Sequence, residues 1–344
     1  MNSIDSYGRS TKSVNRLFLV IIIWTLGAGF LVGRYLQGLS TELQLVAGQL
    51  IILLPVLLFV LIKRVPIKEW IPFRRIGIPT IFMTILFTLL LLPLVSCLNL
   101  LSLFFVTNHL VNTQQGLQEN SFWLNLLVLA LIPAVLEEFT FRGIFYRAYR
   151  EKGVLMAAIG CGVTFGLMHM NFNQFFYALV LGIAFCLLLE ATGSIYATIT
   201  AHFVLNGWSV VMMEVQKWLL SLTESLGQTT NQQTELTQDQ MLIMFGVIAV
   251  IATVTTCIAG CVLVWIAKHN GRLECLKSCL RRKPTEAGEE PVEAGAKPVE
   301  AGEEPVEAGE KPVGAREKPV NRTFITPIYV IAGVICIIYM LRVQ

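Results

Sequence analysis

The sequence predicts an all-α protein, a polytopic membrane helix bundle of about eight core transmembrane helices plus one C-terminal helix after a disordered linker. Three observations support this fold class. Of the 344 residues, 55% are hydrophobic and only 14% are charged, whereas about a quarter of the residues of a soluble domain are charged. Several windows hold the roughly 20 apolar residues with which a helix crosses the hydrocarbon core. Lys and Arg gather in some of the connections between these windows and are almost absent from others, a bias typical of membrane proteins.

The apolar windows place nine expected helices along the chain. They cover residues 17–33, 43–62, 80–106, 122–141, 153–170, 174–190, 195–214, 241–267 and 324–341. Arg9, Lys12 and Arg16 before the first window resemble the start of a signal peptide. The sequence GRY that follows the window is a poor cleavage site, so we expect a retained helix.

Basic residues predict the orientation of the chain. They crowd the N-terminus and three later segments, residues 63–75, 147–152 and 268–283. The loops 107–121 and 215–239 hold a single basic residue, Lys217. By the positive-inside rule, the N-terminus and the end of the eighth window are therefore cytoplasmic, which eight crossings satisfy.

The composition divides the chain into five segments. They are a cytoplasmic N-terminal lead (1–16), a membrane-embedded core (17–268), a basic cytoplasmic segment (269–285), heptapeptide repeats of the type EAGEEPV (286–320) and a C-terminal transmembrane helix (321–344). Pro and Gly recur in every repeat, and both break a helix. The repeats carry almost no large apolar residues, so we expect them to be disordered.

Six polar residues lie within or at the ends of apolar windows: Glu137, Glu138, Arg142, His169, His202 and Asn206. A charge at the centre of a membrane helix costs on the order of 2.5–3.5 kcal/mol, so function is the first hypothesis for such residues. Glu138 and Arg142 share a helix face and can pair. Glu137 lies about 100° around the helix and can point into the bundle independently.

The depth of these residues poses a difficulty. By their windows, Glu137 and His202 lie in the cytoplasmic halves of their helices, whereas His169 lies near the outer end of its helix. A shared site therefore requires a shift of the fifth helix or a deep cavity.

A carboxylate and imidazoles in a secluded cavity suit the activation of water. Glu can act as the general base, and Asn and a second His can donate hydrogen bonds to a developing oxyanion. Alternatively, Glu137, His169 and His202 could bind zinc and leave a fourth position for water. The zinc motif H-E-x-x-H is absent, so spacing alone does not imply a metal. Structural explanations also exist: a Glu–Arg pair can pin two helices, a membrane His can be buried and hydrogen-bonded, and Asn206 can be an interhelical contact.

The polar residues fall into three motifs, EEFTFR (E-E-x-x-x-R), FGLMH (F-x-x-x-H) and HFVLN (H-x-x-x-N). Together with the phrase EATGSIYATITAHFVLNG, they resemble the CPBP (Abi) family of intramembrane proteases, which includes the type II CAAX prenyl endopeptidases and bacterial proteins linked to bacteriocin processing or self-immunity. The resemblance covers residues 120–215 strongly and the eight-helix core loosely. The repeats and the ninth helix have no counterpart in it.

The resemblance implies roles for the motif residues. Glu137, helped by His169, would activate water; Glu138 and Arg142 would support it; His202 and Asn206 would stabilise the oxyanion. The family is named as metalloproteases, yet similar enzymes are described as glutamate-dependent without a metal, so both zinc and no cofactor stay open.

The resemblance also implies the partners and the location of the protein. It implies a peptide or membrane-protein substrate, a lipid bilayer and no nucleic acid. The protein would lie in a bacterial plasma membrane, with its cavity open to the cytoplasmic leaflet. Two alternatives stand beside a protease: a non-catalytic binding or bacteriocin self-immunity protein that uses the same cavity, and a transporter, for which the sequence shows no inverted repeat.

Overall fold

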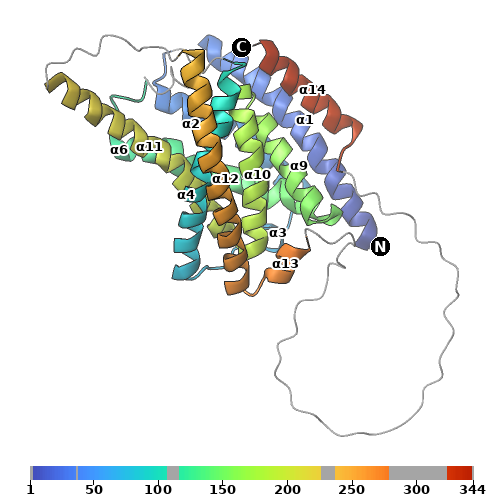
Figure 1. Ribbon diagram of the computed structural model, residues 1–344. Helices are drawn as coiled ribbons and strands as arrows, with labels where there is room; N and C mark the ends of the chain where they lie inside the picture. The colour runs from blue at the N-terminus through green and yellow to red at the C-terminus, as the bar shows by residue number, and fades with distance from the viewer. Residues whose placement is uncertain (1–2, 36–37, 107–115, 226–236, 279–323, 343–344) are drawn as a thin grey trace, which may run out of the picture.

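The computed structural model describes residues 3–35, 38–106, 116–225, 237–278 and 324–342. Within these ranges the chain forms helices and no strand, which confirms the predicted all-α class (Figure 1). The heptapeptide repeats at 286–320 lie outside the described residues, as do residues 279–285 of the basic segment.

The described helices pack together as a bundle. In order they are α1 (Ser3–Tyr35), α2 (Thr41–Lys63), α3 (Ile67–Trp70), α4 (Ile78–Leu103), α6 (Phe122–Asn125), η1 (Leu126–Leu131), α7 (Ile132–Glu138), η2 (Phe139–Tyr146), α8 (Arg147–Tyr149), η3 (Arg150–Lys152), α9 (Val154–Met168), α10 (Phe172–Thr192), α11 (Ile195–Ser225), α12 (Gln238–His269), α13 (Leu273–Lys277) and α14 (Pro327–Arg342).

Every expected span corresponds to a helical segment, but their lengths differ from expectation. Seven described helices are long and apolar enough to cross a membrane. The expected spans 153–170 and 324–341 correspond to α9 and α14, which are shorter, with 15 and 16 residues. The helix α1 begins at Ser3 and so includes most of the expected N-terminal lead, while its candidate membrane span covers Thr11–Val32.

A single continuous helical segment, residues 122–152, lies at the centre of the bundle. It contains two π-helical stretches, η1 and η2. Pro133 follows η1; its ring clashes with the carbonyl four residues earlier in an α-helix, and a wider π turn relieves that clash. Glu137 and Glu138 lie on the α-helical turn between the two stretches. All side chains from Thr140 to Tyr146 are buried, so this segment has no lipid-facing side there.

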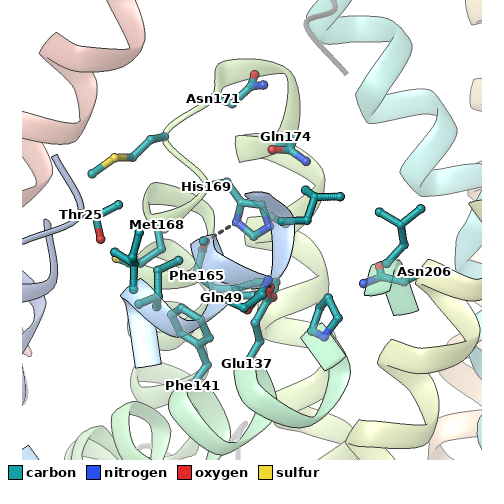
Figure 2. A pocket seen from close by; sticks show the side chains of 18 of the residues that line it. Thr25, Gln49, Glu137, Phe141, Phe165, Met168, His169, Asn171, Gln174 and Asn206 are labelled. Carbon is teal, nitrogen blue, oxygen red and sulfur yellow. Dashed lines mark hydrogen bonds between the residues drawn. The ribbon is translucent and has the colours of Figure 1, made fainter. Parts of the chain in front are cut away.

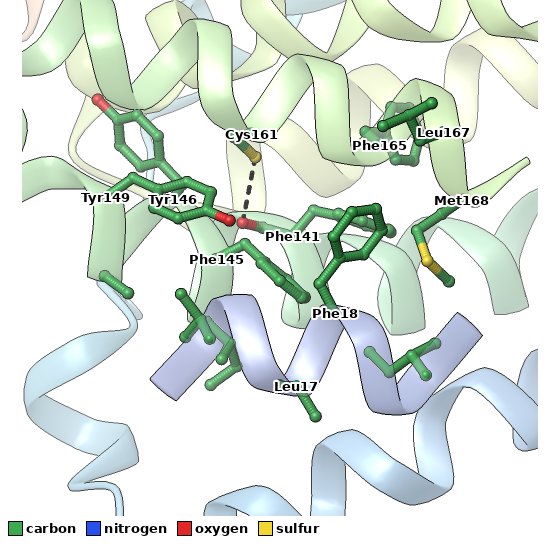
Figure 3. Close-up of a cluster of buried hydrophobic side chains, with 14 of the residues drawn as sticks. Leu17, Phe18, Phe141, Phe145, Tyr146, Tyr149, Cys161, Phe165, Leu167 and Met168 are labelled. Carbon is green, nitrogen blue, oxygen red and sulfur yellow. Dashed lines mark hydrogen bonds between the residues drawn. The ribbon is translucent and has the colours of Figure 1, made fainter. Parts of the chain in front are cut away.

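Aromatic side chains fill the core between α1, η2 and α9 (Figure 3). Phe18 of α1 packs edge-on against Phe145, with ring centroids 6.4 Å apart. Phe141 stacks on Phe145 at 5.8 Å and meets Phe165 of α9 at 4.8 Å. These contacts anchor the central segment, and hence the two glutamates, to both neighbouring helices.

Small residues bring α9 and α10 into close contact. A Cβ atom added to Gly182 would lie 2.6 Å from the Cα of Gly162. Such small residues at a helix crossing let membrane helices approach closely, where there is no hydrophobic driving force from water. The close crossing brings the backbone of α10 next to the site described below.

The two ends of the bundle differ in charge. At one end, Arg150 and Arg272 approach the carboxylate of Glu190, and the Ser194 hydroxyl donates to the carbonyl of Arg74. We call this the basic end; α1, α4, α9, α11 and α14 begin there. At the opposite end, which we call the far end, α1 finishes and α2 begins, near Gln44.

Candidate active site

Four of the sequence-predicted site residues line one cavity of about 700 Å³: Glu137, His169, His202 and Asn206 (Figure 2). Glu137 comes from the central segment, His169 from the end of α9, and His202 and Asn206 from α11; Figure 2 labels Glu137, His169 and Asn206 around the cavity. The other two predicted residues, Glu138 and Arg142, do not line the cavity but lie behind it, with fully buried side chains.

Glu138 joins the predicted ion pair to the cavity. Its Oε1 lies 2.9 Å from Nη1 of Arg142, an ion pair whose angles depart from those of a hydrogen bond. The same oxygen accepts a hydrogen bond of 2.8 Å from Nδ1 of His202. Because a carboxylate can only accept, Nδ1 of His202 carries a proton, and Nε2 is directed toward Glu137.

Arg142 is held by aromatic rings as well as by charge. Its guanidinium lies over the rings of Phe165 and Phe185, at 4.8 and 5.2 Å from their centroids. Its Nη2 donates to the carbonyl of Gly182 over 3.4 Å. Breaking a buried ion pair by removal of one partner costs roughly 3–5 kcal/mol, so this arrangement holds Glu138 and thereby His202 in position.

Glu137 has a separate set of partners. Its Oε1 accepts a hydrogen bond of 2.8 Å from Nε2 of Gln49 on α2. Its Oε2 lies 3.7 Å from Nε2 of His202, too far for a direct hydrogen bond. The side chain is 16% exposed, so the carboxylate is partly open to the cavity.

His169 lies directly after the last residue of α9. Its Nδ1 donates to the carbonyl of Phe165 over 2.8 Å, since a carbonyl oxygen can only accept. Nδ1 is thereby engaged, and in the neutral ring Nε2 is an acceptor. The helix α9 is short, and the cavity extends from the centre of the bundle to the far end. His169 therefore lines the same cavity as Glu137 and His202, although their windows placed them at different depths.

Asn206 lies one helical turn after His202 on α11. Its amide makes no hydrogen bond with any other residue that the structure describes. The amide is therefore available to a molecule in the cavity.

The sequence motifs did not include two polar residues that make buried contacts, Gln49 and Glu190. Gln49 lies in the expected span 43–62, where only Gln44 is a comparable amide, and this interruption of the apolar run is a signal that could have been used. Glu190 ends the window 174–190 and binds the Tyr146 hydroxyl at 2.8 Å and Nε of Arg150 at 2.7 Å. The Glu190 cluster joins η2, η3 and α10 at the basic end, away from the cavity.

A catalytic zinc ion requires three protein ligands that converge on one point. Among the residues that the structure describes, no group of three or more His, Cys, Asp or Glu side chains is arranged to hold a metal ion. The arrangement seen therefore does not fit a three-ligand zinc site, and zinc stays a prediction of the sequence resemblance.

The cavity is exposed at the far end of the bundle. Gly29, near the end of α1, and Gln44, in the first turns of α2, both line it and are exposed. With the basic end in the cytoplasm, as the positive-inside rule predicts, this exposed part lies on the other side from the expected opening to the cytoplasmic leaflet; the orientation stays a prediction. The reason is that α9 starts at the basic end and places His169 at its other end.

Comparison with known proteins agrees with this site. Residues 119–208 match the family model of the Type II CAAX prenyl endopeptidase Rce1-like proteins. Over these residues the chain is similar to the CPBP family, the resemblance that its sequence motifs indicate. All six site residues that the sequence predicts lie within the matched residues 119–208.

A curated relative is also described as a membrane peptidase. YdiL of Bacillus subtilis (strain 168), a proposed membrane peptidase, is 30% identical over 90 residues, which are 26% of this chain and 37% of YdiL. The chain thus covers little more than a third of the length of this relative. No solved structure matches the chain significantly. Gln49 and α14 also line the cavity, but they lie outside the matched residues 119–208.

Proposed function

We propose that the protein is an intramembrane endopeptidase that hydrolyses a peptide bond with a water molecule activated by Glu137. The observation that supports this most is that Glu137, His169, His202 and Asn206, from three separate parts of the chain, line the same cavity. Polar and ionisable side chains inside a membrane helix cost free energy, and helices that carry them usually use them for function. A site that holds water explains why they occur together here.

Glu137 is the general base in this proposal. Its Oε2 and Nε2 of His202 are 3.7 Å apart, so one water can contact both atoms. The carboxylate removes a proton from this water, and the oxygen forms a bond to the carbonyl carbon of the peptide. The proton then passes to the amide nitrogen as the carbon–nitrogen bond breaks. His169 holds the water or the peptide through Nε2.

His202 and Asn206 stabilise the negative oxygen of the tetrahedral intermediate. The bond from Nδ1 of His202 to Glu138 leaves Nε2 directed to the cavity, and in the imidazolium form Nε2 also donates. Asn206 presents an amide with no other described partner. Loss of one such donor typically lowers the rate by about 10²–10³-fold. Glu138 and Arg142 act as positioning residues through His202.

The substrate class follows from the surroundings of the site. The cavity lies within apolar helices and is lined mostly by apolar side chains, so a membrane-associated peptide or membrane protein fits it better than a soluble one. In a bacterial plasma membrane, with the N-terminus in the cytoplasm, the substrate would enter from the far end.

The experiment compares the termini of membrane proteins, by mass spectrometry, in cells that carry the wild type or Glu137→Gln at equal expression. Glu137→Gln keeps the size of the side chain and its hydrogen-bonding capacity toward Gln49, but removes the base. We expect termini that occur only with the wild type. As a control, Glu119→Gln, within the same matched segment, does not alter the cavity lining and keeps those termini.

The same experiment tests the second function. A binding or self-immunity protein uses the shape of the cavity rather than a base, so its cellular effect would survive Glu137→Gln. Identical termini with both proteins, together with an unchanged cellular effect, would contradict proteolysis and favour the binding function.

A further inference from the structure

The C-terminal helix α14 forms one wall of the cavity. Tyr339 and Met340, in its last turns, line the same space as Glu137 and His169. Figure 1 shows α14 running alongside α1, with its C-terminal end at the far end of the bundle. The helix lies outside the segment that matches the CPBP family.

Polar contacts fasten the first turns of α14 at the basic end. The fully buried Asn15 of α1 donates through Nδ2 to the carbonyl of Phe324 at 2.8 Å and to Oγ1 of Thr326 at 3.0 Å. Its Oδ1 accepts from the Tyr149 hydroxyl at 2.7 Å. The hydroxyls of Tyr329 and Thr164 are 3.1 Å apart. Because lipid offers no partner to these groups, they favour the docked helix.

Beyond these polar contacts, one face of α14 packs against the bundle as far as the cavity. Ala332, Cys336 and Met340 follow at helical spacing, and their side chains are at most 1% exposed. The opposite face, which includes Ile337 and Ile338, is exposed and suited to lipid. This buried face holds Met340 at the cavity, and Tyr339, which is 37% exposed, lies beside it in the cavity lining.

We propose that α14 is a selecting wall of the cavity, in which Tyr339 and Met340 limit the size of the peptide side chains that reach Glu137. This rests on the proposed protease function. The polar contacts hold the helix at its start, and the two side chains near its end occupy space that a substrate would otherwise use. Ile338 provides a matched control, because it belongs to the same turn but does not line the cavity.

The first measurement is independent of catalysis. Met168 lines the cavity and is 7% exposed, so Met168→Cys reports access to the interior. We expect its reaction with a small maleimide to become several-fold faster with Tyr339→Ala or Met340→Ala and to stay unchanged with Ile338→Ala. The same chains without Met168→Cys give the contribution of the native cysteines. Equal rates in all of them would overturn the proposal.

The second measurement compares membrane-protein termini for the same α14 variants. Tyr339→Ala and Met340→Ala should add Glu137-dependent termini with larger residues beside the cut, whereas Ile338→Ala should give the wild-type set. Faster labelling without new termini, in cells where wild-type termini are present, would show a wall that does not select peptides and would refute the proposal. If even the wild type gives no Glu137-dependent termini, the proposed function fails, and peptide selection with it, while the labelling still decides whether α14 closes the cavity.

Discussion

At the scale of single residues, the site is a chain of charged and polar contacts. Arg142 pairs with Glu138, Glu138 accepts from His202, His202 faces Glu137, and Glu137 accepts from Gln49. Each member limits the orientation of the next. A base and an oxyanion donor need such fixed geometry, because small displacements of reacting groups cost large factors in rate.

Gln49 offers a direct test of this positioning. Gln49→Leu removes the hydrogen bond of 2.8 Å to Oε1 of Glu137 and frees the carboxylate to turn. Since a hydrogen bond to a charged group contributes about 1.5–3 kcal/mol, we expect a loss of roughly tenfold or more in the abundance of Glu137-dependent termini.

Gln44 supplies the control for that variant. It lies on the same helix and lines the same cavity, but its amide donates to the carbonyl of Leu39 at 2.8 Å. Gln44→Leu should therefore leave the termini close to wild-type abundance. Equal losses in both variants would indicate a general effect of cavity polarity and count against a positioning role for Gln49.

At the scale of elements, the π turns and the glycine crossing determine where the motifs lie. The π-helical stretches flank the turn that carries Glu137 and Glu138. The close contact of α9 with α10 brings the carbonyl of Gly182 within 3.4 Å of Arg142. Thus the spacing of two helices, and not only a side chain, supports the buried cation.

Gly182→Ala tests the crossing of α9 and α10. The added methyl group would lie 2.6 Å from the Cα of Gly162, and both backbones would have to move. Overpacking of this kind costs typically about 1–3 kcal/mol, so we expect a lower midpoint of thermal unfolding in detergent.

Gly246 of α12 serves as the comparison for this substitution. A Cβ atom added there meets nothing within 4 Å. Gly246→Ala should leave the unfolding midpoint unchanged or raise it slightly, because Ala favours helix more than Gly does. A Gly182→Ala protein as stable as Gly246→Ala would mean that the two helices separate without cost.

At the scale of the whole molecule, the basic residues and the exposed part of the cavity lie at opposite ends of the bundle. Lys and Arg gather at the basic end, whereas the cavity is exposed near Gly29 and Gln44 at the far end. Together with the positive-inside rule, this predicts a cavity that opens on the side away from the cytoplasm.

Cysteine labelling in intact cells tests this orientation. An impermeant maleimide should label Gln44→Cys in intact cells, whereas Arg75→Cys, at the basic end, should react only after the membrane is permeabilised. The unsubstituted chain measures the background from native cysteines. The reverse pattern would place the cavity mouth in the cytoplasm, as the sequence resemblance implies.

The sequence by itself determined the helical class, the positions of the spans, the six motif residues and the Glu138–Arg142 pair. These depend on apolar length and on spacing within one helix, which act locally along the chain. It did not reveal that Gln49 contacts Glu137, that α14 lines the cavity or that the cavity is exposed at the far end. Only the tertiary structure decided these, because they depend on which helices pack together and at what depth, and helix packing follows from side-chain fit between segments far apart in the chain.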